Sequence, residues 1–402
     1  MSGEILDGEK RKAFNGIFAA NFVSTFGESI PQSFQPLFLA SLGVQPALIG
    51  LFYNVRNIAQ TIIRVPIGQL SDRIGHRQLM ILGLSLISLV PLLYSFSVNT
   101  YLPLVAMLIS GIGVSIYYPP SEAYASNLYP SDRVGEAMGR FHLGWAISSI
   151  IGPVVGGYLA TILPSYRPIF LMASIVTFSS VFVVFATTKN DSGPGSPNGV
   201  LSELLKILRK SPATIFGLLR NRKVAVASFA IFAHSFTNGS VIVYFPLLAH
   251  GRGASELVIG VALTANALLM GIALPFMGGL SDRLGRLTPI VVGLVLDIVS
   301  FGALPLAPYI WTLPLVMGIK GVGAALVFPV SQAAALEAMP VSDRGVSTGL
   351  WGTVMSLGGT VGMFAMTTVV AATSMEWAFY FLAFVSLVSI WIIVALRDFF
   401  NG

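Results

Sequence analysis

The sequence predicts an all-α membrane protein, with twelve transmembrane helices in two six-helix bundles related by a pseudo-two-fold axis along the membrane normal. Composition is the first reason, because 54% of the residues are hydrophobic and only 10% are charged, which is more apolar than a soluble domain. The second reason is a series of apolar runs long enough to span a bilayer. The third is that the chain repeats itself at an offset of 210 residues.

The apolar runs are the predicted helices. Each can cross about 30 Å of hydrocarbon as a helix, and none shows the period-two alternation of barrel strands. A helix also satisfies its own backbone hydrogen bonds in lipid. The predicted spans are residues 14–40, 47–69, 78–98, 101–128, 137–162, 166–187, 224–249, 255–279, 288–308, 310–337, 346–372 and 375–396.

The basic residues predict the orientation. If both ends are cytoplasmic, 18 of the 23 Lys and Arg residues lie in the terminal segments and cytoplasmic loops, and only Arg167 and Arg252 lie outside. This asymmetry follows the positive-inside rule, so both termini are predicted in the cytoplasm. The first 14 residues lack the pattern of a removable signal peptide.

A short polar motif occurs twice, as GQLSDRIGHR at 68–77 and GGLSDRLGRL at 278–287, and we interpret both copies as loops between spans. A duplicated six-helix unit explains the repeat. Because six is even, both copies insert with the same orientation, and such repeats hold a substrate site between the halves near the bilayer midplane. The same offset pairs Pro36 with Pro246, Gly50 with Gly260, Pro119 with Pro329, Ser121 with Ser331, Pro130 with Pro340, Gly139 with Gly349 and Gly152 with Gly362.

The repeat also predicts the domains. Residues 1–187 form the first bundle and residues 223–402 the second. Residues 188–222 form a cytoplasmic linker, which begins with a flexible Gly-, Pro- and Ser-rich stretch and continues as amphipathic helices on the inner leaflet. A calmodulin-binding helix is the alternative interpretation of that second part.

Several kinds of chemistry are not indicated. The chain has no Cys, which excludes disulfides and thiolate metal sites. It has no nucleotide-binding loop and no HExxH motif, so an enzyme is the least expected function. The net charge of +6 follows from topology and needs no nucleic-acid partner. We expect a monomer in the lipid bilayer, with neither a cofactor nor a metal.

The motif G-x-L-S-D-R-x-G-x-R at 68–77, echoed after the eighth span, resembles the loop signature of the major facilitator superfamily. The number of spans, the repeat and the central linker resemble that family too. The resemblance implies the major facilitator fold and alternating access, in which two bundles rock around a central cavity lined mainly by spans 1, 4, 7 and 10. It indicates no particular substrate.

The resemblance also implies a cytoplasmic gate. It places Asp72 near Ser347 and Asp282 near Gly135, at helix starts whose dipoles favour a carboxylate. Residues 337–345 resemble an E-x-x-P-x-x-x-R-G element of sugar porters, which we interpret as part of the same gate. The predicted gate residues are Gly68, Asp72, Arg73, Gly75, Arg77, Asp282, Arg283, Gly285, Glu337 and Arg344.

The fifth span resembles the antiporter motif of the family and favours export, with Ser148 where the pattern has Gly. Small residues at this spacing also let another helix approach closely, so tight packing is the alternative. In contrast, the drug/proton antiporter branch has an Arg in the fourth span ahead of G-x-G, and this chain has Met107 there. The residues of the fifth-span motif are Gly139, Ser148, Gly152, Pro153, Gly156 and Gly157.

Charged residues inside spans are costly, so each is expected to be paired or functional. Depth along the helices pairs Glu28 with Arg56 at mid-membrane, and Arg64 with Glu122 beside the gate. These four residues have neutral counterparts in the second half, at Asn238, Asn266, Leu274 and Gln332. Asp297 and Lys320 are the mid-depth candidates of the second half, for which a structural role is the alternative.

Glu28 is the first candidate for proton coupling, because a carboxyl group binds or releases a proton as its surroundings change between apolar and cationic. A permanent salt bridge is the alternative. Glu122, Asp297 and His234 are the other candidates, since an imidazole changes its charge near neutral pH. The candidates for the substrate cavity are Asn21, Gln32, Arg56, Tyr117, His234, Asn238, Lys320 and Gln332.

These features together predict a proton-coupled exporter of small amphipathic organic molecules in the cell (plasma or inner) membrane. The alternative is a proton-coupled importer of a sugar or organic anion, with Lys320, Arg56 or the amides holding a polar substrate. A membrane sensor that transports nothing is a third possibility.

Overall fold

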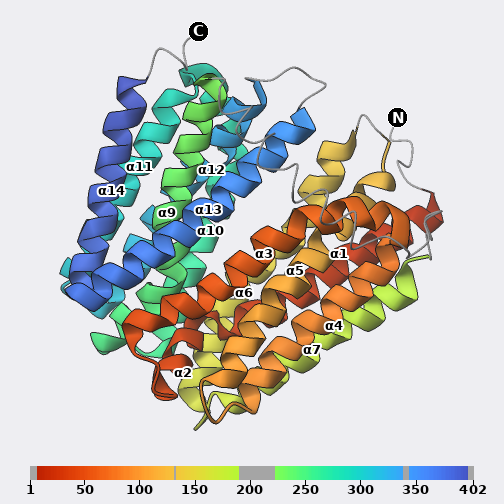
Figure 1. The fold of residues 1–402 in the computed structure, drawn as a ribbon, viewed down its shortest axis with the longest axis horizontal. Helices are drawn as coiled ribbons and strands as arrows, with labels where there is room; N and C mark the ends of the chain where they lie inside the picture. Colours follow the sequence, from red (N-terminus) through yellow and green to blue (C-terminus); the bar gives the residue numbers. More distant parts are fainter. Residues whose placement is uncertain (1–6, 131–132, 190–221, 338–343, 397–402) are drawn as a thin grey trace. The chain divides into compact units, whose positions relative to one another are not determined.

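The computed structural model describes residues 7–130, 133–189, 222–337 and 344–396 of the chain (Figure 1). These residues are helical and contain no strand, which confirms the all-α class. The helices are α1 Gly8–Ser29, η1 Ile30–Ser33, α2 Gln35–Ser41, α3 Pro46–Ile74, α4 His76–Ser95, α5 Tyr101–Asn127, α6 Val134–Ile162, α7 Arg167–Thr187, α9 Arg222–Gly251, α10 Glu256–Leu284, α11 Leu287–Leu306, η3 Ile310–Thr312, α12 Leu313–Glu337, α13 Arg344–Ala372 and α14 Met375–Ala395.

Ten of the described helical segments are long and apolar enough to cross a membrane. They match the third to twelfth predicted spans. The first two predicted spans coincide with α1 and α3, which are not among the ten. Both helices carry charged side chains within their length, Glu28 in α1 and Arg56 and Arg64 in α3.

The first predicted span, 14–40, is wrong as a single helix. The chain leaves α-helical geometry after Ser29, passes through η1 and resumes in α2. Pro31 in η1 is the physical reason, because proline lacks an N–H group and its ring clashes with the preceding helical turn. The counterpart of Pro31 at the 210-residue offset is Val241, and α9 there runs unbroken.

The two polar motifs are helical for most of their length, so their interpretation as loops was also wrong. Helix α3 continues to Ile74 and α10 to Leu284. The chain then turns at Gly75 (φ 104°) and at Gly285 (φ 77°). Glycine occupies these left-handed positions because it has no Cβ atom to clash with the backbone.

The duplication is also visible in the backbone conformation. Positive φ angles in the described residues occur at Gly43, Gly75, Gly253 and Gly285, which form two pairs separated by 210 residues. The ends of α3 and α10 match at the same offset, as do those of α6 and α13. The predicted repeat is therefore confirmed at the level of individual turns.

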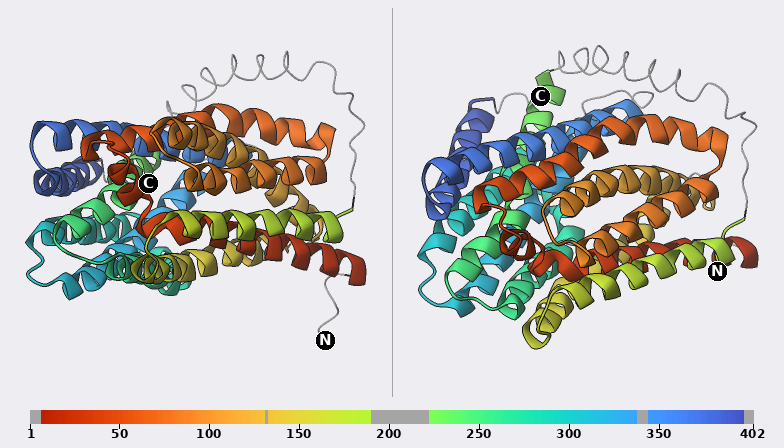
Figure 2. Two further views of the ribbon diagram at one scale, coloured as in Figure 1. Left: turned by 90° about the horizontal axis from the view of Figure 1, so that it is seen from below. Right: turned by 60° about the horizontal axis from the view of Figure 1, so that its bottom comes forward.

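The chain divides into two compact units, one from Met1–Gln32 and Ile58–Arg209 and the other from Ser33–Asn57 and Lys210–Gly402. In the first unit, α1 packs against α6 and α7, and α4 packs against α5 and α7 (Figure 2). In the second, α9 packs against α12, α13 and α14, while α11 packs against α12 and α14. The linker predicted at 188–222 lies almost entirely outside the described residues.

The second unit includes a segment from the start of the chain. Helix α2 contacts α9, and the Tyr244 hydroxyl donates a hydrogen bond of 3.1 Å to the carbonyl of Ala47 in the first turn of α3. The same hydroxyl lies 2.9 Å from Oγ1 of Thr367 on α13. Tyr244 is fully buried, so this contact joins α3, α9 and α13 in a place shielded from solvent.

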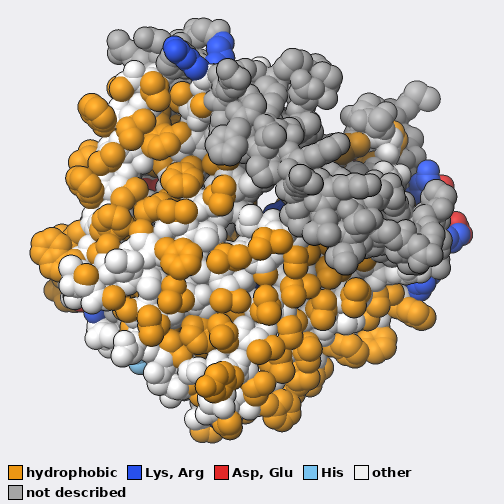
Figure 3. Space-filling view, viewed as in Figure 1, with side chains coloured by type: hydrophobic (Ala, Val, Ile, Leu, Met, Phe, Trp, Pro, Cys, Tyr) orange, Lys and Arg blue, Asp and Glu red, His pale blue; other side chains and the backbone are white. Residues whose placement is uncertain are grey.

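Hydrophobic side chains cover much of the described surface in Figure 3. Phe182 and Phe185 on α7 are 62% and 63% exposed, and Trp391 on α14 is 73% exposed. Such large apolar side chains are favourable on a surface that faces lipid, where the outside of a helix is in contact with hydrocarbon.

Candidate functional site

A buried carboxylate lies in the second unit. Asp297 on α11 is 0% exposed. It is held deep between helices because α11 and α12 approach closely at Gly293 and Gly323, where an added Cβ atom on Gly323 would lie 2.9 Å from the Gly293 carbonyl oxygen. An ionised carboxylate in such a place needs charged or hydrogen-bonding partners.

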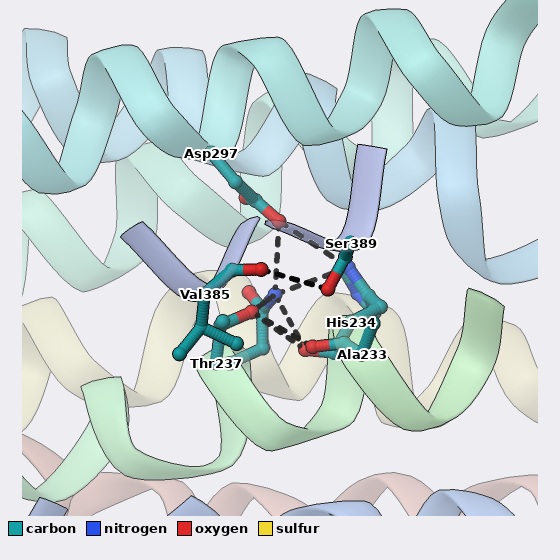
Figure 4. A network of polar contacts seen from close by, with 7 residues as sticks. Ala233, His234, Thr237, Asp297, Val385 and Ser389 are labelled. Atoms are coloured by element: carbon teal, nitrogen blue, oxygen red, sulfur yellow. Dashed lines mark hydrogen bonds and ion pairs between the residues drawn. The ribbon is translucent and has the colours of Figure 1, made fainter. Parts of the chain in front are cut away.

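Helix α9 supplies two of these partners (Figure 4). Nδ1 of His234 lies 3.5 Å from Oδ2 of Asp297, and Nδ2 of Asn238 donates to the same oxygen at 3.3 Å. His234 and Asn238 are four residues apart and therefore share one face of the helix. Asn238 Nδ2 also lies 3.1 Å from His234 Nδ1, so the amide bridges the imidazole and the carboxylate.

Helix α12 supplies the third partner. Lys320 is only 6% exposed, and the negative charge of Asp297 acts on its amino group through space rather than through a direct ion pair. Asp297 Oδ1 accepts no hydrogen bond from a described residue and lies 3.4 Å from where a Cβ atom on Gly323 would be. The carboxylate therefore lies between α9 on its Oδ2 side and α12 on its Oδ1 side.

We define His234, Asn238, Asp297 and Lys320 as the Asp297 cluster. It combines an acid, an imidazole and an ammonium away from water, and charge added to one member changes the electrostatic free energy of the others. Among the described residues, no group of three or more His, Cys, Asp and Glu is arranged to hold a metal ion.

The first unit has a different charged cluster. Arg64 and His142 both lie close enough to Glu122 to act on it electrostatically, and a direct pairing of Arg64 with Glu122 stays a prediction. Sequence reasoning missed His142, which lies on α6. The residue 210 positions later is Gly352. This difference between the two halves could have identified His142 from the sequence. Glu28 and Arg56 are both half-buried, and their pairing stays a prediction.

Two of the cavity candidates lie in the interior of the first unit. Asn21 is 0% exposed, and its Nδ2 donates a 2.9 Å hydrogen bond to the carbonyl of Phe141 on α6. Tyr117 is also 0% exposed and belongs to the hydrophobic core of that unit. Gln32 and Gln332 are half-buried, and a role for either in binding stays a prediction.

The small residues of the predicted fifth-span motif lie on α6, and most of them face α1. Ser148 is buried and donates a 2.7 Å hydrogen bond to the Phe22 carbonyl. A Cβ atom on Gly152 would overlap Ser29, and one on Gly156 would overlap the Ile30 carbonyl. Pro153 and Gly157 are buried as well, whereas Gly139 is exposed. The observed contacts are those of tight helix packing.

The predicted gate residues are described only in part. Glu337 forms a two-point ion pair with Arg286, at 2.5 Å and 3.2 Å, and Arg286 also donates to Ser281. Arg286 was not among the predicted residues. Arg77 Nη2 donates a 2.8 Å hydrogen bond to the Phe185 carbonyl, and Arg283 is exposed. The side chains of Asp72, Arg73, Asp282 and Arg344, and the surroundings of Gly68, lie outside the described part of the structure.

Solved structures share this fold. A POT family transporter in complex with a thioalcohol-conjugated peptide superposes with a TM-score of 0.79 at 14% identity, covering 97% of this chain and 96% of that one. The human organic anion transporter MFSD10 superposes with a TM-score of 0.69 at 16% identity, covering 96% and 100%. Identities this low establish the fold alone.

Curated relatives match across most of the chain. Multidrug resistance protein MdtG of Proteus mirabilis is 25% identical over 385 residues, 92% of this chain and 93% of that protein. The MFS-type transporter MJ1560 of Methanocaldococcus jannaschii is 24% identical over 356 residues, 86% and 88%. The class B tetracycline resistance protein of Escherichia coli is 25% identical over 283 residues, 69% and 68%.

A family model covers almost the entire chain. The model of the Major Facilitator Superfamily matches residues 17–233 and 227–399, and these two ranges together cover both copies of the internal repeat. Together with the helical fold and the paired turns at Gly75 and Gly285, this match identifies the protein as a member of the Major Facilitator Superfamily.

Proposed function

We propose that this protein is a secondary active transporter that exports small amphipathic organic molecules in exchange for protons, working by alternating access. The buried Asp297 cluster carries the proposal, because it places a protonatable carboxylate and an imidazole inside a membrane-spanning bundle. Relatives named for multidrug and tetracycline resistance support outward transport. The protein would act as a monomer in the cell membrane, with both termini in the cytoplasm and no enzymatic step.

The cluster suggests how a proton is carried. When Asp297 is ionised, its negative charge acts on the buried Lys320 and its Oδ2 accepts a hydrogen bond from Asn238 on α9. A proton arriving at the cluster binds to Oδ1, the carboxylate oxygen without a hydrogen bond from a described residue. Protonation removes the negative charge and weakens the attraction of Asp297 for Lys320 and His234. The packing of α9, α11 and α12 therefore depends on whether Asp297 is protonated. Coupling of proton binding to a conformational change requires such a dependence.

The sequence asymmetry supports this assignment. The counterparts of Asp297 and Lys320 at the 210-residue offset are Ile87 and Ser110, and that of His234 is Ser24. The counterpart of Asn238 is Glu28, so only the acid, the imidazole and the lysine of the cluster belong to the second half alone. A residue needed for packing in both halves would be expected in both copies, whereas a coupling site is needed only once.

The test is transport in energised inverted membrane vesicles with a fluorescent amphipathic cation such as ethidium. We expect proton-driven accumulation by the unaltered protein. Asp297→Asn should abolish that accumulation while retaining exchange of labelled for unlabelled dye, which needs no proton. Glu136→Gln is the matched control, since Glu136 lies at the start of α6 in surface ion pairs with Arg133 and Arg140.

Two results would contradict the proposal. Accumulation only in right-side-out vesicles would mean import, the alternative direction. Full proton-driven accumulation by Asp297→Asn would remove the Asp297 cluster from coupling, and Glu28→Gln would then be the variant expected to lose it.

A further inference from the structure

A groove in the first unit lies outside the proposed transport machinery. It is formed where the first turns of α1 meet the last turns of α7, and it has a volume of about 500 Å³. The two helices touch at its floor, because an added Cβ atom on Gly16 would overlap Thr187. The lining residues are Gly8, Arg11, Lys12, Asn15, Gly16, Ala19, Val183 and Thr187.

The groove is polar and cationic at one end and apolar at the other. Arg11, Lys12 and Asn15 line the end near the start of α1, whereas Ala19 and Val183 line the other end. Ala19 lies eight residues beyond Arg11, a rise of about 12 Å along the helix. On α7 the neighbours of Val183 include Phe182 and Phe185, both more than 60% exposed. The apolar end therefore opens onto the surface that contacts hydrocarbon.

Two described acidic residues near this groove have partners of their own. Asp7 accepts a 2.8 Å hydrogen bond from the backbone N–H of Lys10, as the N-cap of α1. Glu9 forms a 2.7 Å ion pair with Lys189. Neither lines the groove, so its lining contains two cations and no carboxylate. The positive end of the α1 dipole adds to this charge.

We propose that this groove binds one anionic phospholipid of the inner leaflet. Its phosphate lies against Arg11 and Lys12, and the start of an acyl chain follows Ala19 and Val183. Charge complementarity selects an anionic headgroup, and the apolar end selects a lipid over a free phosphate. Basic pockets between helices on the cytoplasmic side bind anionic headgroups in this way. In Figure 3 Lys and Arg side chains lie beside Asp and Glu side chains on the right, where α1 begins in Figure 1.

The test is native mass spectrometry of the purified protein in detergent, titrated with dioleoyl phosphatidylglycerol or with dioleoyl phosphatidylcholine. Both lipids have the same acyl chains, and only the first has a net negative charge. We expect preferential retention of phosphatidylglycerol. Lys12→Gln should weaken its binding about fivefold, the effect of one basic residue near a membrane surface.

Lys10→Gln is the matched control. It removes the same charge two residues away, from an exposed side chain that does not line the groove, and should leave the affinity nearly unchanged. Ala19→Trp keeps every charge and fills the apolar end, so it should also reduce lipid retention. A thermal melt of each variant shows whether it is folded.

Each contrary result overturns the proposal. If Lys10→Gln and Lys12→Gln weaken phosphatidylglycerol binding equally, the lipid is attracted by the basic segment as a whole and not by the groove. Equal retention of the two lipids would mean that the headgroup is not recognised. Full retention by folded Ala19→Trp would mean that the groove is not the site. Displacement of the lipid by glycerol phosphate would mean that a free phosphate is the ligand. None of these results bears on proton-driven export.

Discussion

Nδ1 of His234 lies 3.5 Å from Oδ2 of Asp297, on side chains that are 7% and 0% exposed. The two residues come from α9 and α11, which meet where α14 packs against both. The relationship places a titratable base beside a buried acid within one bundle. It gives the second half of a duplicated chain a chemistry that the first half lacks at the same positions.

Asp297 and Lys320 should stabilise the bundle only as a pair. Asp297→Asn or Lys320→Met alone removes the attraction between the two buried groups and should lower the thermal midpoint. The double variant should recover most of that loss, because both charges are then absent. Thermal unfolding in detergent measures all four proteins, and additive losses in the double variant would contradict the pairing.

Gly156 and Gly139 should respond oppositely to alanine, although both belong to the predicted fifth-span motif. A Cβ atom at Gly156 would overlap the carbonyl of Ile30, whereas nothing lies within 4 Å of one at Gly139. Gly156→Ala should therefore destabilise by at least about 1–3 kcal/mol. Gly139→Ala should be neutral or slightly stabilising, since alanine favours the helix. Similar melting temperatures for the two variants would show that α6 and α1 are less tightly packed.

Gly285 should not tolerate alanine, but Gly279 should. Both belong to the second polar motif, yet Gly285 has a φ of 77° and Gly279 has no left-handed φ. A side chain in the left-handed region costs about 1–2 kcal/mol, so Gly285→Ala should lower the thermal midpoint. Gly279→Ala lies in α10 with open space around it and should leave the midpoint unchanged or raise it. The opposite order would contradict the helix end described at Leu284.

The ion pair between Glu9 and Lys189 should depend on pH. The hydrogen bond and the charge of the Glu9 carboxylate raise the pKa of the Lys189 ammonium. The contribution of the pair is therefore complete below the ordinary pKa of lysine and is lost as the pH rises through the raised pKa. Both side chains are exposed, so the effect on stability is small.

Amine acetylation followed by peptide mass spectrometry measures this effect at Lys189. Glu9→Gln should shift the onset of Lys189 labelling to lower pH, because the neutral amide no longer stabilises the ammonium. The labelling of Lys12 is the internal reference for the reaction, because no described hydrogen bond joins Lys12 to Glu9. An unchanged onset would mean that the Glu9–Lys189 contact does not persist in solution.

Helix boundaries show where sequence reasoning reached its limit. The apolar runs predicted the later spans well because hydrophobic length is a property of the local sequence. The break at Ile30–Ser33 was missed, although Pro31 was visible, because a proline within an apolar run can kink a helix or end it. The motifs at 68–77 and 278–287 were assigned as loops because they are polar, but a polar segment can continue a helix beyond the bilayer.

The composition of the Asp297 cluster was only partly predictable. Asp297 and Lys320 were identified because a charge in an apolar run is costly wherever the run lies. That Asn238 bridges His234 and Asp297 was not predictable, because it depends on the rotation of α9 about its axis. The same holds for His142 near Glu122 and for Arg286 with Glu337.

The sequence by itself determined the fold class, the duplication and the family. Hydropathy, the spacing of the repeated motif and the turn glycines are properties of the local sequence, so they do not depend on long-range contacts. Tertiary structure alone decided which polar side chains meet. Neighbouring helices rotate and approach until their small residues fit, as at Gly293 with Gly323 and Gly156 with Ile30. That fit, which sums many weak contacts over the length of each helix, brings His234 and Asn238 to the same carboxylate.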